Sequence, residues 1–274
     1  MIYFNDGIKE KLQKIKGSDF YILSDYDQTI TGGVSSWELP SHLESSSVEF
    51  KEHCVEVGAR FLTMLREYNQ TGDFALREKI TGWWYELLAE FVDNKVDLSE
   101  MKEAVLNDGI VVVRDGTKEF FEMLNKCGVP IVILSAGFVA VIETTLLREG
   151  CLLDNVEVFA NIIETDSDNK ITGVKGEMIH LFNKAEENLR TKTLEKIKDK
   201  ANVILLGDQI ADVEMLPEHK RESAVKIAFR SSRASLQPEG YLKYFDIVCD
   251  EKTSFVELME ELKNKYDFVF GGTV

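Results

Sequence analysis

The sequence contains little proline and cysteine. The first shortage argues against flexible linkers between domains, and the second against a scaffold held by disulfides or by a cysteine-bound metal. Four prolines in 274 residues leave no proline-rich linker, and no low-complexity tract or internal repeat is present. The four cysteines include no CxxC pair and no spacing typical of metal ligands. They favour reduced, mostly buried thiols in a cytoplasmic protein. These cysteines are Cys54, Cys127, Cys151 and Cys249.

Long apolar runs are also missing. No stretch reaches the length that a membrane-spanning helix needs. The first residues, Met1 to Asp6, lack the basic and apolar regions of a signal peptide. With 44% hydrophobic and 29% charged residues, the chain has the composition of a soluble globular protein with a sizeable core. We therefore expect no membrane partner, and a monomer or a weak oligomer.

Basic residues are too few for binding to a nucleic-acid polymer. The chain has 32 lysines and arginines against 48 aspartates and glutamates, a net charge of −16. A phosphate backbone needs a basic footprint, so DNA and RNA are excluded as partners. A small phosphate ester remains compatible with this charge, because one metal ion and one lysine can reverse the field inside a cleft.

The pattern of apolar runs predicts an α/β fold with a mostly parallel sheet. Helical segments separate the expected strands, and the segments 117–126 and 139–148 end at Gly128 and Gly150, which suit left-handed C-caps. Ser254 and Glu257 have the spacing of a capping box at the start of the last helix. Strands alternating with such helices indicate right-handed parallel crossovers. The expected strands are Phe20–Ser24, Val129–Leu134, Val156–Ile163, Asn202–Leu206, Ala224–Phe229 and Asp246–Cys249.

One interval breaks the alternation of strands and helices. Residues 34–106 contain no convincing strand, and their patterns predict helices over Val48–Tyr68, Phe74–Val92 and Ser99–Leu106. Because ligands of open α/β sheets bind at the carboxyl ends of the strands, an insertion after the first strand would cover such a site. We therefore expect a core of residues 1–33 and 107–274 with a helical cap of residues 34–106.

Two acidic clusters follow two of the expected strands. Asp25 and Asp27 come after Phe20–Ser24, and Asp208 and Asp212 come after Asn202–Leu206. Carboxylates at neighbouring strand ends can hold a divalent cation, and one can attack while another carries a proton. Two such clusters, far apart in the sequence, predict one site at the edge of a parallel sheet.

Two further elements suit a phosphate ligand. The turn Ser135-Ala136-Gly137 is expected to join a strand to a helix and to present a hydroxyl and backbone N–H groups to an anion. A lysine near a metal-bound phosphate would neutralise charge. Local spacing does not select between Lys175 and Lys184 for this role.

The order of these elements resembles the haloacid dehalogenase (HAD) superfamily of phosphotransferases. Its pattern is DxDx[TV] after the first strand, Ser or Thr after the second, then a lysine, then an acidic pair. Here the pattern is carried by Asp25, Asp27, Thr29, Ser135, Lys184, Asp208 and Asp212. The resemblance implies a HAD-like Rossmannoid core with a cap inserted after the first strand.

The chain is also similar to the cytosolic pyrimidine 5′-nucleotidase family. The similarity covers the first strand and residues 107–265, and the segment Lys175–Lys184, ending Ile-His-x-Phe-Asn-Lys, is its most specific part. In that family the lysine after Phe-Asn contacts phosphate, which favours Lys184. The other similar parts are Ile133–Gly137, Asn202–Asp212 and Tyr244–Val248.

The resemblance implies a role for each residue of the motif. Asp25 would be the nucleophile, forming an aspartyl-phosphate, and Asp27 the acid and base. Mg²⁺ would be held by Asp25, the Asp27 backbone carbonyl and Asp208, and Asp212 would orient Lys184 or a metal-bound water. Thr29, Ser135, Ala136, Gly137 and Lys184 would contact the phosphoryl group.

The cap departs from the family pattern, and the cap selects the leaving group. Trp84-Tyr85 looks like the family's aromatic pair, but the Ser-His-Gly expected soon after it is absent. Trp84, Tyr85 and Glu67 are candidates for contacting a base.

The function expected from the sequence is a magnesium-dependent 5′-nucleotidase, a phosphoric monoester hydrolase acting on a pyrimidine nucleoside 5′-monophosphate such as UMP or CMP. Two alternatives stay open. One is a phosphatase of the same superfamily acting on another small ester, such as phosphoserine, a sugar phosphate or another nucleotide. The other is a non-catalytic phosphate- or metal-binding regulatory protein.

Overall fold

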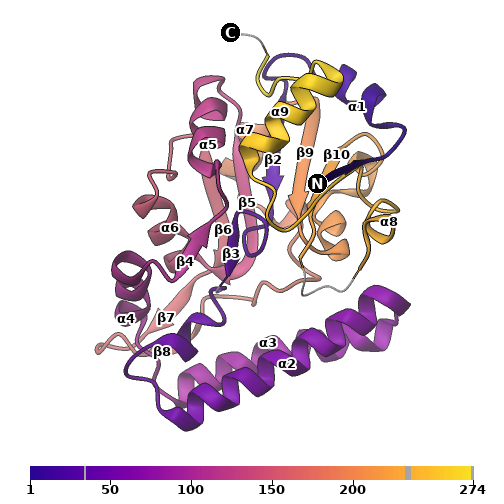
Figure 1. The fold of residues 1–274 in the computed structure, drawn as a ribbon. Helices are drawn as coiled ribbons and strands as arrows, with labels where there is room; N and C mark the ends of the chain where they lie inside the picture. Colours follow the sequence, from indigo (N-terminus) through magenta and orange to yellow (C-terminus); the bar gives the residue numbers. More distant parts are fainter. Residues whose placement is uncertain (34, 232–235, 273–274) are drawn as a thin grey trace.

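The core of the protein is a seven-stranded, mostly parallel sheet (Figure 1). The computed structural model describes residues 1–33, 35–231 and 236–272. The strand order is β1-β11-β10-β9-β2-β5-β6, and every neighbouring pair is parallel except β1 with β11. The strands are β1 (Ile2–Phe4), β2 (Phe20–Ser24), β5 (Ile131–Phe138), β6 (Val156–Asn161), β9 (Asn202–Gly207), β10 (Val225–Phe229) and β11 (Ile247–Cys249).

Both faces of this sheet are covered, which explains why its central strands are apolar throughout. Alternate residues of β2 enter two separate clusters: Ile22 packs on one face and Leu23 on the other. Their neighbours on β9, Ile204 and Leu205, follow the same division because they are paired in register. The first face is covered by α1 (Ile8–Lys14), α5 (Thr117–Lys126), α6 (Val139–Arg148) and α9 (Phe255–Tyr266). The second is covered by α7 (Thr191–Ile197), α8 (Pro238–Tyr241) and short helical turns.

The helix ends follow the signals read from the sequence. α5 and α6 have the predicted limits, and the glycines beyond them, Gly128 and Gly150, have φ of 66° and 68°. Ser254 and Glu257 form the expected capping box at the start of α9. These boundaries depend on the local chain alone, so a single sequence is enough to predict them.

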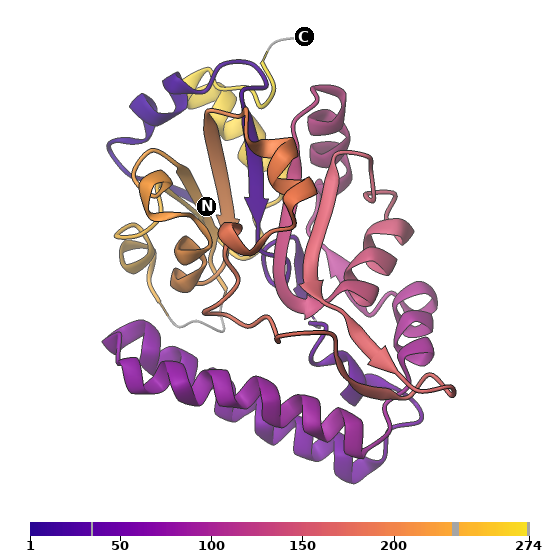
Figure 2. The ribbon, with the colours of Figure 1, turned by 180° about the vertical axis from the view of Figure 1, so that it is seen from behind.

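The insertion after β2 is helical, as predicted. α2 (Val48–Thr71) and α3 (Phe74–Asp93) form a long antiparallel hairpin, and Ser47 and Asp73 cap their N-termini. This hairpin lies across the end of the core that carries the carboxyl ends of the strands (Figures 1 and 2). The rest of the insertion comprises η1 (Leu39–His42), α4 (Leu98–Glu103) and the π-helical turn η2 (Ala104–Asp108).

The chain enters and leaves the insertion through one small ladder. β3 (Thr31–Gly33) pairs antiparallel with β4 (Val111–Val113). The sequence had not predicted these strands, because three residues give no readable periodicity. Glycines lie at both connections: Gly32 and Gly33 in β3, and Gly109 at the end of η2 with φ of 61°.

Two sequence predictions about the strands were wrong. The run Val156–Ile163 is divided, because the chain leaves the main sheet after Asn161 and forms a separate hairpin of β7 (Ile163–Thr165) and β8 (Ile171–Val174). This hairpin packs against the cap: Ile171 N donates to Val96 O at 2.9 Å. Ser135-Ala136-Gly137 is not a turn either, because β5 continues to Phe138 through an irregularity in its pairing with β6.

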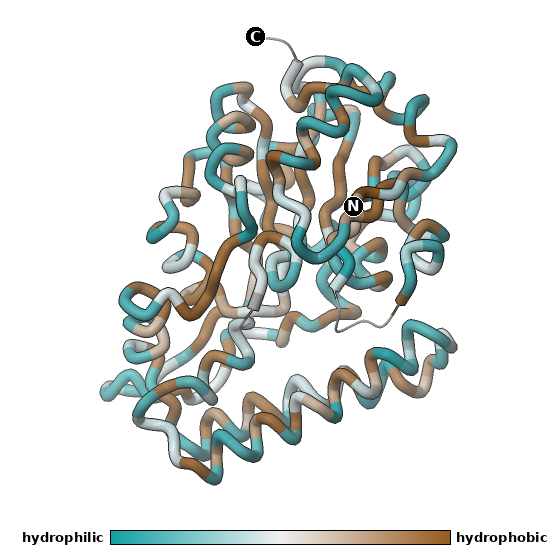
Figure 3. The backbone as a smooth tube through the Cα atoms, in the orientation of Figure 1, coloured by the Kyte–Doolittle hydropathy of each residue, from teal (hydrophilic) through white to brown (hydrophobic). Residues whose placement is uncertain are grey.

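The cap helices alternate polar and apolar residues (Figure 3), whereas the central strands are mostly apolar. Within the described ranges, no helix is both long and apolar enough to cross a membrane.

The remaining short helical turns are η3 (Glu186–Asn188), η4 (Ile210–Met215) and η5 (Glu218–Lys220).

Candidate active site

Three adjacent strands bring the predicted motif residues together. β9, β2 and β5 are neighbours in the sheet; Asp208 and Asp25 directly follow β9 and β2, and Ser135 lies in the carboxyl half of β5. The backbone of Asp25 continues the ladder past the end of β2, since its N–H donates to Leu206 O at 2.9 Å. The site predicted from two distant acidic clusters therefore forms at one edge of the sheet.

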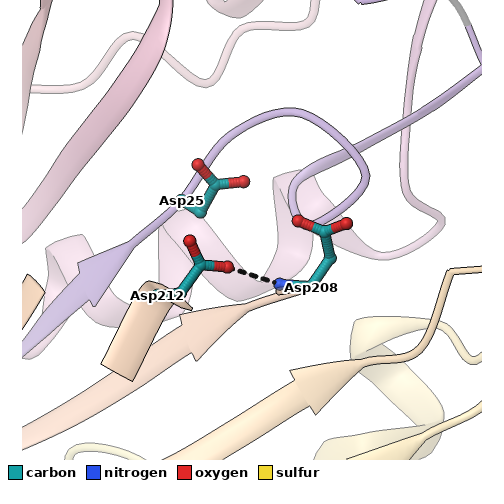
Figure 4. A group of neighbouring side chains, drawn as sticks. All are labelled: Asp25, Asp208 and Asp212. Carbon is teal, nitrogen blue, oxygen red and sulfur yellow. Dashed lines mark hydrogen bonds between the residues drawn. The ribbon is translucent and has the colours of Figure 1, made fainter. Parts of the chain in front are cut away.

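Asp25, Asp208 and Asp212 form a compact carboxylate cluster (Figure 4). One oxygen of each lies within 4.8 Å of one oxygen of the others, and all three side chains are buried. Burial, followed by the nearby Asp212 and Asp25 carboxylates, raises the pKa of Asp208 well above its usual range. Such a concentration of buried negative charge is stable only if cations or protons offset it.

Asp212 is held by the turn that contains it. Its Oδ2 accepts the N–H groups of Asp208 at 2.9 Å and Gln209 at 2.8 Å. Gln209 and Asp212 form a capping box around η4. A Cβ on Gly207 would lie 2.6 Å from Asp212 Oδ2, so only glycine leaves room for this carboxylate. Asp212 is therefore fixed in place before any ligand binds.

Lys184 is the lysine of the site, and Lys175 is not. The Lys184 ammonium pairs with Asp25 Oδ1 and lies 2.8 Å from Asp212 Oδ1, and the residue is 5% exposed. Although burial opposes it, Asp212 and Asp25 raise the pKa of Lys184, so the ammonium stays charged. Lys175 follows β8 and is exposed.

The loop after β2 is held by a buried arginine. Gln28 has a φ of 64°, in the left-handed region, and Thr29 Oγ1 lies 3.4 Å from Asp25 Oδ2. Arg114 donates from Nε to Thr29 O at 2.8 Å and from Nη2 to Gln28 O at 2.9 Å. Its guanidinium also lies over the Phe229 ring, 4.0 Å from the centroid. These contacts fix the unusual loop backbone that presents Asp25 and Asp27.

Both carboxyl groups of the loop have raised pKa values, and of the two it is Asp25 that pairs with Lys184. Burial raises the pKa of Asp25 to about 6, partly opposed by Lys184. Burial, with Asp25 and Glu38 adding to it, raises the pKa of Asp27 to about 7. The Asp27 Oδ1 atom is buried and has no hydrogen-bond partner among the described residues. A proton on Asp27 and a charge on Asp25 are therefore compatible at neutral pH.

The segment Ser135-Ala136-Gly137 faces the same loop. Ser135 Oγ accepts the Gly137 N–H at 2.9 Å, so this amide is engaged within the segment. A Cβ on Gly137 would lie 2.8 Å from Ser36 Oγ and 3.2 Å from Asp27 Oδ2. Ala136 O accepts Trp37 Nε1 at 2.7 Å. The small residues thus allow the strand end to approach Asp27 closely.

The carboxylates have the donor set of a hard divalent cation. Both oxygens of Asp212 are engaged, one by two N–H groups and the other by Lys184. Asp25 Oδ1 pairs with Lys184, Asp25 Oδ2 lies 3.4 Å from Thr29 Oγ1, and Asp208 Oδ2 accepts from Gln209. Among the hydrogen bonds of the described residues, neither carboxylate accepts two backbone N–H groups as Asp212 does. A cation would also relieve the repulsion between these buried carboxylates. The residues therefore fit Mg²⁺, with Asp25 and Asp208 as ligands and Asp212 behind them.

A cavity of about 410 Å³ extends from these carboxylates into the cap. Its floor includes Asp25, Asp27, Ser135, Lys184 and Asp208. Its cap side is mainly apolar and aromatic, as ligand pockets usually are. The cap side is lined by Trp37, Cys54, Val55, Gly58, Ala59, Phe61, Leu62, Leu65, Trp83, Trp84 and Leu87, with Glu38, Ser41 and His42 as polar members.

The three cap residues suggested for base contact lie in different places. Trp84 lines the cavity, and its Nε1 has no hydrogen-bond partner among the described residues. Tyr85 is 49% exposed and Glu67 is also exposed, and neither lines the cavity. Both face outward because neighbouring positions of α2 and α3 point to different sides of the hairpin.

Sequence reasoning missed Trp37, Glu38 and Gln209. Trp37 packs edge-on against Trp84, with ring centroids 4.8 Å apart, and Glu38 lies beside it in the cavity lining. Gln209 lies between the two motif aspartates and donates to the Asp208 carboxylate. Trp37 and Glu38 precede the first cap helix, where no periodicity marks them. The one available signal for Gln209 was its place inside the second acidic cluster.

Comparisons of sequence with known proteins identify the family of the chain. The profile described as pyrimidine 5′-nucleotidase (UMPH-1) matches residues 42–263. A 7-methylguanosine phosphate-specific 5′-nucleotidase from Gallus gallus is 27% identical over 259 residues, covering 89% of this chain and 87% of that protein. The Xenopus laevis 7-methylguanosine phosphate-specific 5′-nucleotidase A is 29% identical over 168 residues, 61% of this chain. That match spans 58% of the length of the Xenopus protein.

Comparisons of structure give the same fold. The crystal structure of cytosolic 5′-nucleotidase IIIB bound to cytidine matches with a TM-score of 0.76 and 23% identity, covering 93% of this chain and 90% of that one. A substrate-bound phosphoserine phosphatase matches with a TM-score of 0.57 and 19% identity, covering 91% and 99%. The fold is therefore that of the HAD phosphatases. The chain belongs to the pyrimidine 5′-nucleotidase family, a family of HAD-fold phosphoric monoester hydrolases.

Proposed function

We propose that this protein is a magnesium-dependent 5′-nucleotidase that hydrolyses a nucleoside 5′-monophosphate. The observation that carries this proposal is the meeting of Asp25, Asp208 and Asp212 with Lys184 at the floor of a cavity under the cap. The floor suits a metal-bound phosphate, and the aromatic cap side suits the flat, largely apolar faces of a base. Family membership supports the same reaction class.

Asp25 acts as the nucleophile in this proposal. Its carboxylate oxygen forms a bond to phosphorus while the bond from phosphorus to the 5′ oxygen breaks. Asp27 gives its proton to that leaving oxygen, then takes a proton from the water that attacks the aspartyl-phosphate and regenerates Asp25. The pKa values of about 6 for Asp25 and about 7 for Asp27 support this division of roles.

Mg²⁺, when bound, neutralises negative charge on the phosphoryl oxygens. The Asp25 and Asp208 carboxylates and the Asp27 backbone carbonyl would hold it. Around that centre, Lys184 supplies a second positive charge and Asp212 keeps the ammonium in position. Thr29, Ser135 and the backbone N–H of Ala136 bind and orient the phosphoryl group, and the Gly137 N–H, which donates to Ser135 Oγ, orients that hydroxyl. Catalysis then depends mainly on positioning and charge neutralisation.

For the base, we propose pyrimidine nucleotides such as UMP and CMP first. A second candidate is 7-methylguanosine monophosphate, because relatives with this specificity are similar to the chain. Trp37, Trp83 and Trp84 in the cavity lining favour it, since indole faces attract a cationic base. The apolar cap side disfavours phosphoserine and sugar phosphates, which are polar throughout. A purely binding protein would have no use for the acid–base carboxyl of Asp27.

We also propose a cytoplasmic location. Cys54, Cys127, Cys151 and Cys249 are all free thiols, as expected in a reducing compartment. The partner in this proposal is a small phosphate ester.

A phosphate-release assay on a substrate panel tests the proposal. The panel contains UMP, CMP, 7-methylguanosine monophosphate, AMP, phosphoserine and a sugar phosphate, each with Mg²⁺ and with excess chelator. We expect release from at least one of the first three, lost on chelation and abolished by Asp25→Asn. Asp168→Asn, at the exposed tip of the β7–β8 hairpin, is the matched control and should be fully active. Turnover by Asp25→Asn equal to that of the native protein would remove Asp25 as nucleophile.

A further inference from the structure

The tip of the cap hairpin, where α2 ends at Thr71 and α3 begins at Phe74, packs on the core next to the carboxylate cluster. Leu65 of α2 and Leu76 and Ile80 of α3 form one buried cluster with Leu181 and Ala211 of the core. Leu181 lies in the loop that leads to Lys184, and Ala211 lies in η4 just before Asp212. The cap therefore contacts the two core segments that carry site residues.

An ion pair secures this contact. Arg77, in the first turns of α3, donates to both carboxylate oxygens of Glu214 in η4, at 3.0 and 2.7 Å. Its guanidinium also lies 4.3 Å from the centroid of the Phe182 ring. Two parallel N–H···O bonds fix orientation as well as distance. The hairpin tip is thus held in one register against η4.

A second polar contact leads from the cap to the carboxylate cluster itself. Asn69, near the end of α2, donates from Nδ2 to Gln209 Oε1 at 3.3 Å. Gln209 Nε2 in turn donates to Asp208 Oδ2. The Gln209 side chain also accepts the N–H of Asp212, which completes the capping box. One amide therefore joins the cap, the η4 turn and the Asp208 carboxylate.

We propose that Gln209 is a positioning residue that makes the orientation of the Asp208 carboxylate depend on docking of the cap. The amide has one oxygen and one nitrogen, and its oxygen is held by a cap donor and by the η4 backbone. Holding the oxygen fixes the direction of the nitrogen, and the nitrogen fixes Asp208. When the cap tip is displaced, the amide loses one of these two donors and Asp208 loses part of its restraint.

The consequence concerns metal binding, and so it rests on the function proposed above. Mg²⁺ requires ligands in near-ideal directions, and carboxylate ligands held by hydrogen bonds bind it more tightly. Docking of the cap over the cavity would therefore strengthen Mg²⁺ binding at the floor. By reciprocity, bound Mg²⁺ would favour the docked cap.

Isothermal titration calorimetry with Mg²⁺ alone tests this without any measurement of activity. Asn69→Ala removes the cap donor and leaves every residue of the carboxylate cluster in place. We expect it to weaken Mg²⁺ binding by about two- to tenfold, the effect of one hydrogen bond. Gln209→Ala should weaken it by roughly tenfold or more. In the Gln209→Ala background, Asn69→Ala should weaken Mg²⁺ binding by less than about a further twofold. Both changes interrupt the same series of hydrogen bonds from Asn69 through Gln209 to Asp208, so their effects should not add.

A matched arginine pair gives an independent measurement. Arg77→Met breaks the contact to Glu214 and should also weaken Mg²⁺ binding. Arg60 pairs with Glu86 at 2.6 Å inside the cap and touches no core residue through that pair, so Arg60→Met should leave the Mg²⁺ dissociation constant unchanged. Circular dichroism of each variant shows whether it is folded.

The outcomes separate this inference from the proposed function. If the native protein binds Mg²⁺ and Asn69→Ala binds it equally well, or if the two changes are fully additive, the role of Gln209 is overturned while the nucleotidase proposal stands. If the native protein shows neither Mg²⁺ binding nor Mg²⁺-dependent phosphate release, both proposals are overturned. Weaker binding in Asn69→Ala and Arg77→Met, with Arg60→Met unchanged, supports the coupling.

Discussion

The Lys184 ammonium lies 2.8 Å from the Asp212 carboxylate and pairs at the same time with Asp25. A single buried cation thus joins the end of β2 to the turn after β9. Removing the ammonium leaves the buried carboxylates of Asp25 and Asp212 without a cation, close to the buried carboxylate of Asp208. Uncompensated buried charges of this kind lower the free energy of unfolding.

Lys184→Met should therefore impair both stability and activity. Loss of one partner from a buried ion pair costs about 3–5 kcal/mol in the free energy of unfolding. Loss of a charge that stabilises the phosphoryl group should lower kcat/KM by roughly 100- to 1000-fold. Urea denaturation and phosphate release measure the two effects. Lys175→Met is the matched control, because Lys175 is exposed, and we expect less than about 0.5 kcal/mol of change from it.

Gly207→Ala should disturb the same turn from the backbone side. The added Cβ would lie 2.6 Å from Asp212 Oδ2 and 2.7 Å from Asp212 Cβ, so the aspartate must move away from the N–H groups that it accepts. We expect a loss of about 1–3 kcal/mol in stability and weaker Mg²⁺ binding. Gly82→Ala, on an exposed face of α3 with nothing within 4 Å, should instead stabilise the protein by about 0.5–1 kcal/mol. Equal effects at the two glycines would contradict the packing argument.

The stability of the metal-free protein should depend on pH through Asp25 and Asp27. Their pKa values rise from 3.8 to about 6 and about 7 on folding, so the folded state binds more protons between these limits. The stability that this binding contributes is complete below about pH 4 and is lost as pH rises to 7. Asp27→Asn should remove the contribution of Asp27 to this pH dependence, which is up to about 1.4 kcal/mol in the free energy of unfolding per pH unit. Denaturation of both proteins in chelator across this pH range measures the difference, and parallel curves would contradict it.

Trp84 and Tyr85 should respond differently to the loss of a polar atom. Trp84 lines the cavity with an indole N–H that has no partner in the described ranges, whereas Tyr85 lies outside the cavity lining. Trp84→Phe should raise KM for the best nucleotide by about two- to tenfold with little change in kcat, as expected for loss of uniform binding. Tyr85→Phe should change neither constant. A larger effect at Tyr85 would place the base elsewhere.

Much of the core could be predicted because its signals are local. β2 is an unbroken run of five buried residues, and the limits of α5 and α6 follow from glycines that adopt positive φ. The acidic clusters were predictable for a different reason: parallel strands place their carboxyl ends at one edge, whatever their separation in sequence. Asp25 and Asp208 meet there as expected.

The parts that could not be predicted depend on contacts between distant segments. β1 has three residues and exists because it pairs with β11, more than 240 positions away. The β7–β8 hairpin is fixed by its contact with the cap, as in the bond from Ile171 to Val96. Gln209 gives no sign in the sequence that a cap asparagine will contact it. Each of these features depends on a contact between two elements that are distant in the sequence. Local secondary-structure propensity describes each element by itself and gives no information about that contact.

The small ladder between β3 and β4 makes the cap an exchangeable unit. Thr31 lies opposite Val113 and Gly33 opposite Val111, so the two points where the chain crosses between the layers are neighbours in space. An insertion whose ends meet in this way can be replaced by one of different length without moving the strands that carry Asp25 and Ser135. Transplanting a relative's cap between these two strands would then alter the choice of nucleotide and leave the chemical step in place.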